Sequence, residues 1–397
     1  MKKIALLLFF LTAIQFANAQ IESHVITTGV PFLLVAADAR AAGMGDQGVA
    51  TSSDAFAQQW NPAKYAFALD KQGFTTSYTP YLANLVNDIS LGQATYYNRI
   101  NERSAFASSL RYFGLGEIQL TDMNGEQLNT VKPSEFAFDG SYSLKLSERF
   151  AMAVAGRYIR SALRVPSAGS GDASAASTFA FDIAGFYQGE EKAYEGFDGR
   201  MRLGFNFSNM GPKINYDKSL SDVNSANFLP AIMRLGGGYD FIFDDYNRVS
   251  VNLELAKLLV PSRQSADLNG DGLITTSEEI ALQDKNNADY RKINWVSGML
   301  KSFSDAPGGF SEELKEVTYS LGTEYVYQDS FAFRLGYFHE SPMKGARKFF
   351  SLGAGFKYNV VKVDLSYLFS TSSVKNPLEN TLRFSLTFNF GSKYDDL

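Results

Sequence analysis

The chain has 397 residues, no cysteine, two histidines, and a formal net charge of −5 at pH 7. This mildly acidic balance offers no basic surface to neutralise phosphates, so we expect no nucleic-acid partner. The chain has no cysteine and no histidine to spare for a relay, which excludes Cys/His nucleophiles and histidine metal centres, and we expect that the protein is not an enzyme.

The first 19 residues have the pattern of a secretory signal peptide. Lys2 and Lys3 form a positive start, residues 4–16 are apolar, and residues 17–19 are a small-x-small cleavage site before Gln20. The apolar run is too short to cross a bilayer comfortably as a helix, although an uncleaved anchor is the alternative. No later apolar run reaches 18 residues, which excludes transmembrane helices. We therefore predict an exported protein.

Residues 73–391 repeat segments of about ten to thirteen residues with apolar side chains at every second position. Because successive strand side chains point to opposite faces, each segment has one apolar face and one polar or small face. A soluble β-sandwich is the alternative, but its strands usually have five or six residues, whereas these suit a tilted membrane crossing. Fourteen strands are predicted, at 72–80, 86–97, 103–113, 134–146, 149–161, 177–189, 199–210, 231–243, 248–259, 316–328, 330–340, 346–358, 360–371 and 380–391.

The connections between these segments alternate in length. Short ones lie at 98–102, 147–148, 244–247, 329 and 359, a medium one at 190–198, and long ones at 114–133, 162–176, 211–230 and 260–315. Short periplasmic turns and long extracellular loops are typical of outer-membrane barrels, and an even strand count predicts that both termini are periplasmic. Lipid cannot hydrogen-bond to an open sheet edge, so we predict an all-β fold, a closed 14-stranded antiparallel transmembrane β-barrel.

The polar faces of the predicted strands carry glycines and charges. Glycine permits close backbone approach and curvature of the wall, at Gly204, Gly322, Gly336, Gly353 and Gly355. The charges are predicted to pair across the lumen, either as structural pairs or as a gate, at Asp182, Arg202, Glu254, Glu324, Arg334 and Asp364.

The segment before the first strand is rich in alanine and is predicted to form short helices and turns. Wall side chains alone cannot fill the lumen of fourteen strands, so a plug inside the barrel is expected. The predicted organisation is a signal peptide at 1–19, an N-terminal plug or hatch segment at 20–70, a barrel at 71–391, and a periplasmic tail at 392–397.

Two motifs in the plug segment carry a family resemblance. Asn61-Pro62-Ala63 resembles the hatch signature of the FadL family of fourteen-stranded outer-membrane transporters. The longer block DARAAGMGDQGVAT at 38–51, followed by QWNPAK at 59–64, closely resembles the PorV (LptO) family, the outer-membrane component of the Bacteroidota type IX secretion system. Strand number, chain length and signal peptide agree with this resemblance over the whole chain.

The resemblance to the PorV family implies a shuttle in the outer membrane. Such proteins take cargo that bears a C-terminal domain signal from the large SprA/Sov-like translocon. They deliver it to the PorU-containing attachment complex at the cell surface. The alternative is a FadL-like channel for hydrophobic small molecules, which would use the plug and the lumen.

Residues 267–278 fit the EF-hand calcium loop, with Gly272 at its sharp turn. Residues 279–283 can form the exit helix, whereas Pro261 leaves little room for an entering helix. A solvated turn cluster is the alternative. We predict a structural Ca²⁺ that orders the extracellular loop 260–315, with ligands Asp267, Asn269, Asp271, the carbonyl of Leu273, Thr275 and Glu278.

Overall fold

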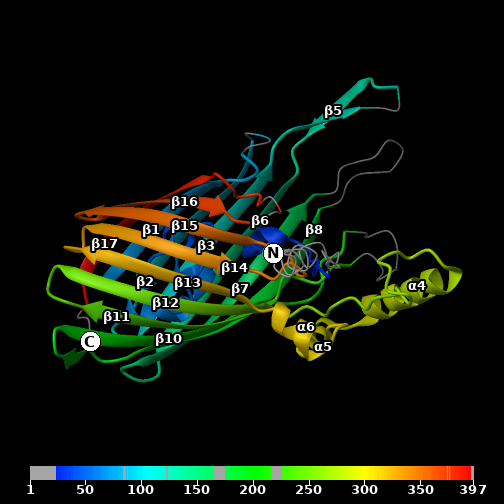
Figure 1. Cartoon of the computed structure of the whole chain (residues 1–397). Helices are drawn as coiled ribbons and strands as arrows, with labels where there is room; N and C mark the ends of the chain where they lie inside the picture. The colour runs from blue at the N-terminus through cyan, green and yellow to red at the C-terminus, as the bar shows by residue number, and fades with distance from the viewer. Residues whose placement is uncertain are drawn as a thin grey trace, which may run out of the picture.

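The computed structural model describes residues 24–394 except 84–85, 87, 122–123, 164–174, 217–225, 373 and 375, so the predicted signal peptide lies outside the described residues. Fourteen long antiparallel strands form the wall of a barrel (Figure 1). These strands are β1 (Asp70–Pro80), β2 (Ile89–Arg99), β3 (Ser104–Leu115), β6 (Ser134–Lys145), β7 (Phe150–Ala162), β8 (Ala176–Gln188), β10 (Phe197–Met210), β11 (Ile232–Ile242), β12 (Asn247–Leu258), β13 (Thr318–Tyr327), β14 (Phe331–His339), β15 (Lys348–Tyr358), β16 (Val361–Ser370) and β17 (Leu382–Lys393).

The barrel is closed, because every wall strand pairs with a neighbour on both sides. The first and last strands meet along a seam in which Phe74 lies opposite Phe388, and β10 pairs with β11 along its length. The fold predicted from the alternating pattern is therefore confirmed. Among the described residues, no helix is long and apolar enough to span a membrane.

The wall has its apolar side chains outside and its polar side chains inside. Phe138 and Phe179 expose 53% and 66% of their surface on the outer face, whereas Asp139 and Arg383 are 1% exposed on the inner face. This distribution is the reverse of that in a water-soluble barrel, and it fits a wall that is solvated by lipid.

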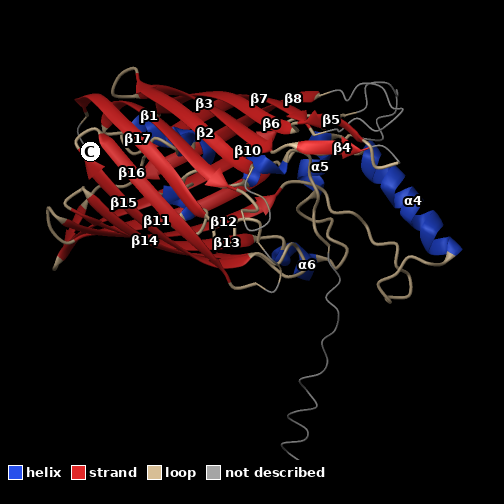
Figure 2. Cartoon of the chain, turned by 90° about the horizontal axis from the view of Figure 1, so that it is seen from above, coloured by secondary structure: helices blue, strands red, loops and turns tan. Residues whose placement is uncertain are grey.

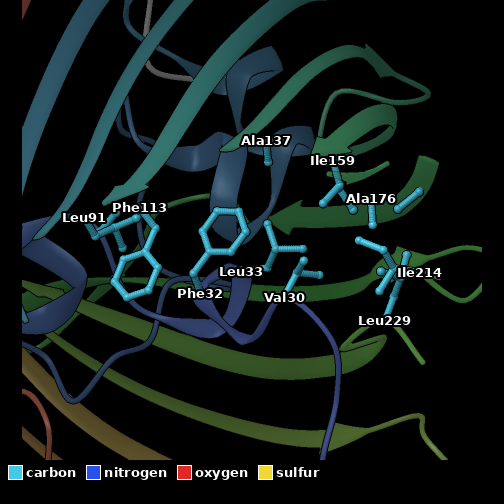
Figure 3. Close-up of a cluster of buried hydrophobic side chains, with 12 residues drawn as sticks. Val30, Phe32, Leu33, Leu91, Phe113, Ala137, Ile159, Ala176, Ile214 and Leu229 are labelled. Atoms are coloured by element: carbon cyan, nitrogen blue, oxygen red, sulfur yellow. The ribbon is translucent and has the colours of Figure 1, made fainter. Parts of the chain in front are cut away.

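The lumen is filled by the segment that precedes β1, which we call the plug (residues 24–69). It contains η2 (Pro31–Leu34), α2 (Ala39–Ala42), α3 (Ala57–Trp60) and η3 (Pro62–Phe67), and all four lie inside the ring of strands (Figure 2). Near one mouth, apolar plug residues pack on the wall, and the rings of Phe32 and Phe113 stack with their centroids 6.1 Å apart (Figure 3).

The two ends of the described chain lie at opposite mouths of the barrel (Figure 1). At the mouth with the long loops, the backbone N–H of His24 donates to the carbonyl of Met343. At the mouth with the short turns, the N–H of Tyr394 donates to the carbonyl of Leu69, just before β1. The prediction that both termini lie on one side is therefore wrong for the described chain, because the plug adds one crossing of the lumen to the even number of strands.

The long loops carry structure of their own. β4 (Ile118–Thr121) and β5 (Gln127–Val131) form a separate two-stranded hairpin, and β9 (Lys192–Tyr194) extends the sheet beside β10 at the opposite mouth. The loop between β12 and β13 contains α4 (Ser277–Lys292), α5 (Trp295–Lys301) and α6 (Phe310–Lys315). The hairpin and α4 project away from the wall at the same mouth (Figure 1).

Candidate functional site

The Asn61-Pro62-Ala63 motif fastens the plug to the wall. Asn61 caps η3, since its Oδ1 accepts a hydrogen bond from the N–H of Ala63, 3.1 Å away. Its Nδ2 donates to the carbonyls of Val49 in the plug and Gly185 in β8, both at 2.9 Å. Pro62 occupies the first helical position, where a missing N–H costs nothing. All the polar atoms of this fully buried amide group are thus bonded.

Glycines of the inner wall let the plug backbone approach closely. A Cβ on Gly204 would lie 2.1 Å from the carbonyl oxygen of Val49, and a Cβ on Gly336 would lie 2.1 Å from the nitrogen of Gly45. A Cβ on Gly353 would lie 3.1 Å from the Cα of Gly43. The predicted close approach at these glycines is confirmed. At Gly355 the neighbours are instead wall side chains, those of Asp364 and Arg334.

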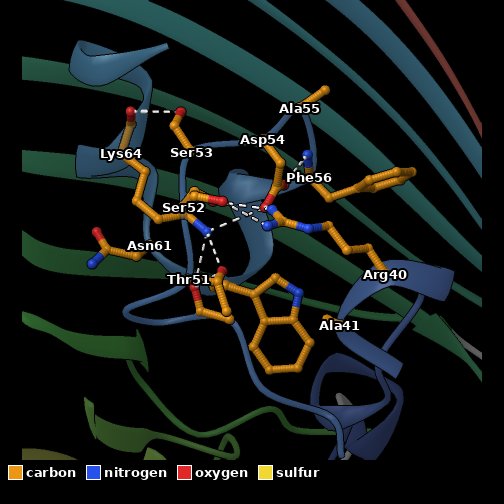
Figure 4. A network of polar contacts seen from close by, with 12 residues as sticks. Arg40, Ala41, Thr51, Ser52, Ser53, Asp54, Ala55, Phe56, Asn61 and Lys64 are labelled. Carbon is orange, nitrogen blue, oxygen red and sulfur yellow. Dashed lines mark hydrogen bonds and ion pairs between the residues drawn. The ribbon is translucent and has the colours of Figure 1, made fainter. Parts of the chain in front are cut away.

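Charged side chains connect the plug to β13, and Figure 4 shows the part of this network that lies within the plug. Arg40 pairs with Asp54 at 2.6 Å within the plug and with Glu324 of the wall at 2.8 Å. Lys64 is fully buried, 3.3 Å from Asp54, and also donates to the carbonyl of Gly48 at 2.9 Å. A buried charge without partners is costly, so each of these side chains disfavours displacement of the others.

The inner-wall charges are paired, as predicted, but the pairs join neighbouring or next-neighbouring strands of the wall rather than opposite sides of the lumen. Glu324 on β13 lies 2.6 Å from Arg334 on the adjacent β14, and Arg334 lies 2.8 Å from Asp364 on β16, across the intervening β15. The other predicted residues pair with partners that were not foreseen, in the pairs Asp182 with Arg157, Arg202 with Asp240, and Glu254 with Arg234.

Wall side chains also bind the plug backbone directly. Glu254 accepts from the N–H groups of Gly48 and Val49 at 2.8 and 2.9 Å. Asn206 donates to the carbonyl of Trp60 at 2.7 Å. The plug is thus held by hydrogen bonds as well as by packing, from several sides of the barrel.

One cavity lies on each side of the plug. The cavity at the short-turn mouth has a volume of about 570 Å³ and is lined by Arg40, Glu324 and Arg334 among others. The cavity at the long-loop mouth is smaller, about 80 Å³, and is lined by Trp60 and by Lys344 of the β14–β15 loop. The Nε1–H of Trp60 donates to Asp38 at 2.8 Å, which fixes the orientation of the ring beside this cavity.

A cluster of charges, the mouth cluster (Lys257, Glu312, Glu313, Glu316 and Lys344), lies beside the smaller cavity, whose lining includes Glu316 and Lys344. Lys344 lies 2.6 Å from Glu312 and 2.9 Å from Glu316, and Lys257 pairs with Glu313 at 3.0 Å and with Glu316. His24 adds a contact of 2.8 Å from Nδ1 to Glu312. The sequence analysis missed this cluster, whose only local signal is two glutamates in a six-residue helix and a third directly after it.

The predicted calcium loop is folded around Asp267. Its two carboxylate oxygens accept hydrogen bonds from the N–H groups of Gly270 and Gly272, each at 2.7 Å. Asn269 donates to Asp271 at 3.0 Å, so the residues at positions 1, 3 and 5 lie together. Leu273 and Thr275 follow on the way to α4. In the described part of the chain, no three His, Cys, Asp or Glu side chains are arranged to hold a metal ion.

The exit helix of this loop is α4, which starts at Ser277 and is longer than predicted. Glu278 is exposed in its first turn, while Glu279 reaches back to accept from the N–H groups of Leu268, Thr275 and Thr276. These hydrogen bonds, above all the one from Thr276, lower the pKa of Glu279 to about 2. Glu279 therefore closes the loop onto its helix through a capping box.

Comparison with known proteins gives one decisive match. A family profile described as "Type IX secretion system protein PorV" matches residues 18–265. The chain belongs to the PorV family. The matched residues include the plug and the wall from β1 to β12, and they end just before the calcium loop and α4–α6. The PorV match therefore covers the plug and its Asn61-Pro62-Ala63 motif, and the family that it identifies is one of the type IX secretion system.

Several solved barrels resemble this PorV-family chain at low sequence identity. A Pseudomonas aeruginosa FadL homologue is 13% identical, with 93% of this chain and 100% of that chain covered and a TM-score of 0.44. The Pseudomonas putida toluene transporter TodX is 10% identical (93% and 98% covered, TM-score 0.46), and the Ralstonia pickettii toluene transporter TbuX is 11% identical (91% and 100% covered, TM-score 0.47). A search of curated protein sequences found no match.

Proposed function

We propose that the protein is an outer-membrane shuttle of the type IX secretion system. It takes cargo that bears a C-terminal domain signal from the SprA/Sov-like translocon and delivers it to the PorU attachment complex at the cell surface. The family match over residues 18–265 is the observation that carries this proposal. In the proposal, the long loops and the start of the described chain at His24 are extracellular, and its end at Tyr394 is periplasmic.

The fastened plug supports a role in binding proteins rather than in conduction. A solute that crossed the lumen would have to displace the buried pairs of Arg40 with Asp54 and Glu324. The β4–β5 hairpin and α4, in contrast, project from the long-loop mouth, where a partner can reach them (Figure 1). Loops on a rigid scaffold are the usual place for binding residues.

A FadL-like channel for hydrophobic small molecules is the second candidate. The observation in its favour is the pair of cavities, about 570 and 80 Å³, on either side of the plug. This function requires the plug to move, so that both cavities join.

Isolation of the protein from its native membranes separates the two candidates. The shuttle should be recovered with a very large translocon and with proteins that carry the type IX C-terminal domain. A matched variant replaces residues 118–131, a hairpin outside the barrel sheet, by a short turn, and tests whether the hairpin contributes to this recovery. Normal surface attachment of cargo in a deletion strain, with loss of hydrocarbon uptake, would contradict the shuttle and favour the channel.

Calcium binding by residues 267–278 is a further part of the proposal. The turn gathers oxygen-bearing side chains at Asp267, Asn269 and Asp271, and calcium prefers six to eight oxygen ligands. The carbonyl of Leu273, Thr275 and Glu278 would complete the ligand set. The role of the ion is structural, since it would order a loop that projects into the calcium-rich exterior.

A further inference from the structure

The short helices α5 and α6 have their charges inside and their apolar side chains outside. On α6, Glu312, Glu313 and Glu316 are buried in the mouth cluster, whereas Phe310 and Leu314 expose 77% and 58% of their surface. A helix in water would show the opposite arrangement.

The outward surface continues onto α5. Leu300 is 71% exposed, and Val296 and Phe303 are about half exposed. The opposite face of α5 is packed on the barrel rim at Gly298, where a Cβ would lie 2.8 Å from Phe228 and 3.2 Å from Pro261. We call Val296, Leu300, Phe303, Phe310 and Leu314 the α5–α6 apolar face. A group of five large apolar side chains exposed on two short consecutive helices is typical of an interaction surface.

This face is continuous with the lipid-facing wall. The ring of Trp295, at the start of α5, packs edge-on against Phe181 with the centroids 6.0 Å apart, and Phe181 points outward from β8. On the other side, α6 leads directly into β13, whose outward residues begin with Tyr319 and Leu321. The α5–α6 segment therefore lies on the outside of the wall near the ends of the strands (Figure 1).

The charges beside the apolar face are basic. Lys301 and Lys315 are exposed at the ends of the two helices, and the acidic residues of α6 are held inward by Lys257 and Lys344. An apolar face bordered by lysines matches the boundary between acyl chains and anionic headgroups.

We propose that the α5–α6 apolar face is inserted into the outer leaflet of the membrane around the barrel, as an interfacial anchor of the long loop. The anchor fixes the end of the loop that closes the mouth, while α4 stays free to project. It depends on the membrane location of the barrel and not on transport of cargo, so vesicles without any secretion component can test it alone.

The absence of cysteine allows a direct test with spin labels. Single variants Leu300→Cys and Phe310→Cys are labelled with a nitroxide and reconstituted in phosphatidylethanolamine/phosphatidylglycerol vesicles. Two matched controls bracket the result: Leu321→Cys, about half exposed on the lipid-facing wall, and Ile280→Cys, about half exposed on α4. Collision rates are measured with oxygen, which partitions into lipid, and with a water-soluble nickel chelate.

Labels at 300 and 310 should behave like the label at 321, with several-fold more collisions with oxygen than with nickel. Behaviour like the label at 280 would place the face in water and overturn the proposal. Low collision rates with both reagents would also overturn it, because they would show burial against a protein, such as a second copy of the chain.

The native tryptophans give a second test that needs no label. The chain has only Trp60, which is buried in the plug, and Trp295. Brominated lipids should quench part of the emission, and the Trp295→Phe variant should lose this quenchable part. An unchanged quenchable fraction in the variant would contradict insertion at α5.

Discussion

The side-chain amide of Asn61 donates to the carbonyl of Gly185 in β8 at 2.9 Å, and thereby links the plug to the wall. The Asn61→Ala variant loses this bond, the bond to Val49 and the cap of η3. Because it leaves buried partners unsatisfied, we expect a loss of about 1–3 kcal/mol in the free energy of unfolding. Asn286→Ala, which removes one exposed hydrogen bond on α4, is the control and should cost little. Equal stability of the two variants in detergent would contradict the anchoring role.

A methyl group at Gly204 should displace the plug. The Gly204→Ala substitution places a Cβ 2.1 Å from the carbonyl oxygen of Val49, and overpacking of this kind costs about 1–3 kcal/mol. Gly156→Ala, on the outer face of β7, meets nothing within 4 Å and is the matched control. Protease cleavage within the plug and the unfolding midpoint would measure the difference. A Gly204→Ala protein with a protected plug and unchanged midpoint would show that the plug backbone is not held there.

Removal of the Arg40 guanidinium should loosen the plug from the wall. Arg40→Met leaves Asp54 and Glu324 without one partner each, and the loss of one partner of a buried pair costs roughly 3–5 kcal/mol. We also expect higher ion conductance in planar bilayers, because the plug is a barrier in the lumen. Lys132→Met breaks an exposed pair with Glu117 and should change neither quantity. Wild-type conductance and stability in Arg40→Met would show that these ion pairs do not hold the plug against the wall.

The loop 260–315 should become protease-resistant when calcium is added. Asp267→Ala and Glu278→Ala should abolish this protection, because each removes a proposed ligand. Glu279→Ala is the informative control: it breaks the capping box of α4 and should lower protection with and without calcium. Identical cleavage of the wild-type loop in calcium and in chelator would exclude the site.

The capping box also has a predictable pH dependence. Glu279 has its pKa lowered from 4.5 to about 2, so its contribution to α4 is complete above about pH 4.5 and is lost as the pH falls through about 2.

The start of the described chain should be accessible from the same side as the long loops. Val25→Cys is about half exposed at the long-loop mouth, whereas Asp329→Cys lies in a short turn at the other mouth. An impermeant maleimide added to intact cells should label the first variant and not the second. Labelling of Asp329→Cys alone would reverse the proposed orientation of the barrel.

The wall and the plug could be predicted from sequence because their signals are local. A period of two residues between apolar side chains defines each strand, as in β17, and the Asn61-Pro62-Ala63 motif starts a helix by its own hydrogen bonds. The partners of the charges could not be predicted, since they depend on register and on the path of the plug. Arg383 pairs with Asp46 at 2.8 Å, although 337 positions separate them.

The α5–α6 segment and the mouth cluster were missed for a related reason. In α6 the glutamates are buried only because Lys257 and Lys344 meet them from other loops and strands. Short helices of six or seven residues have little stability of their own. Their positions are therefore decided by tertiary contacts that leave no periodic pattern in the sequence.

The seam between β1 and β17 has a consequence for how the molecule is assembled. The plug precedes β1, yet it is bonded to β8, β10, β12, β13 and β17. The barrel cannot close until β17 has been synthesised and delivered to the membrane. By then the plug must already lie in the lumen, or it must enter later through one of the mouths. Assembly of the barrel therefore has to coordinate insertion of the N-terminal plug with pairing of the C-terminal strand β17.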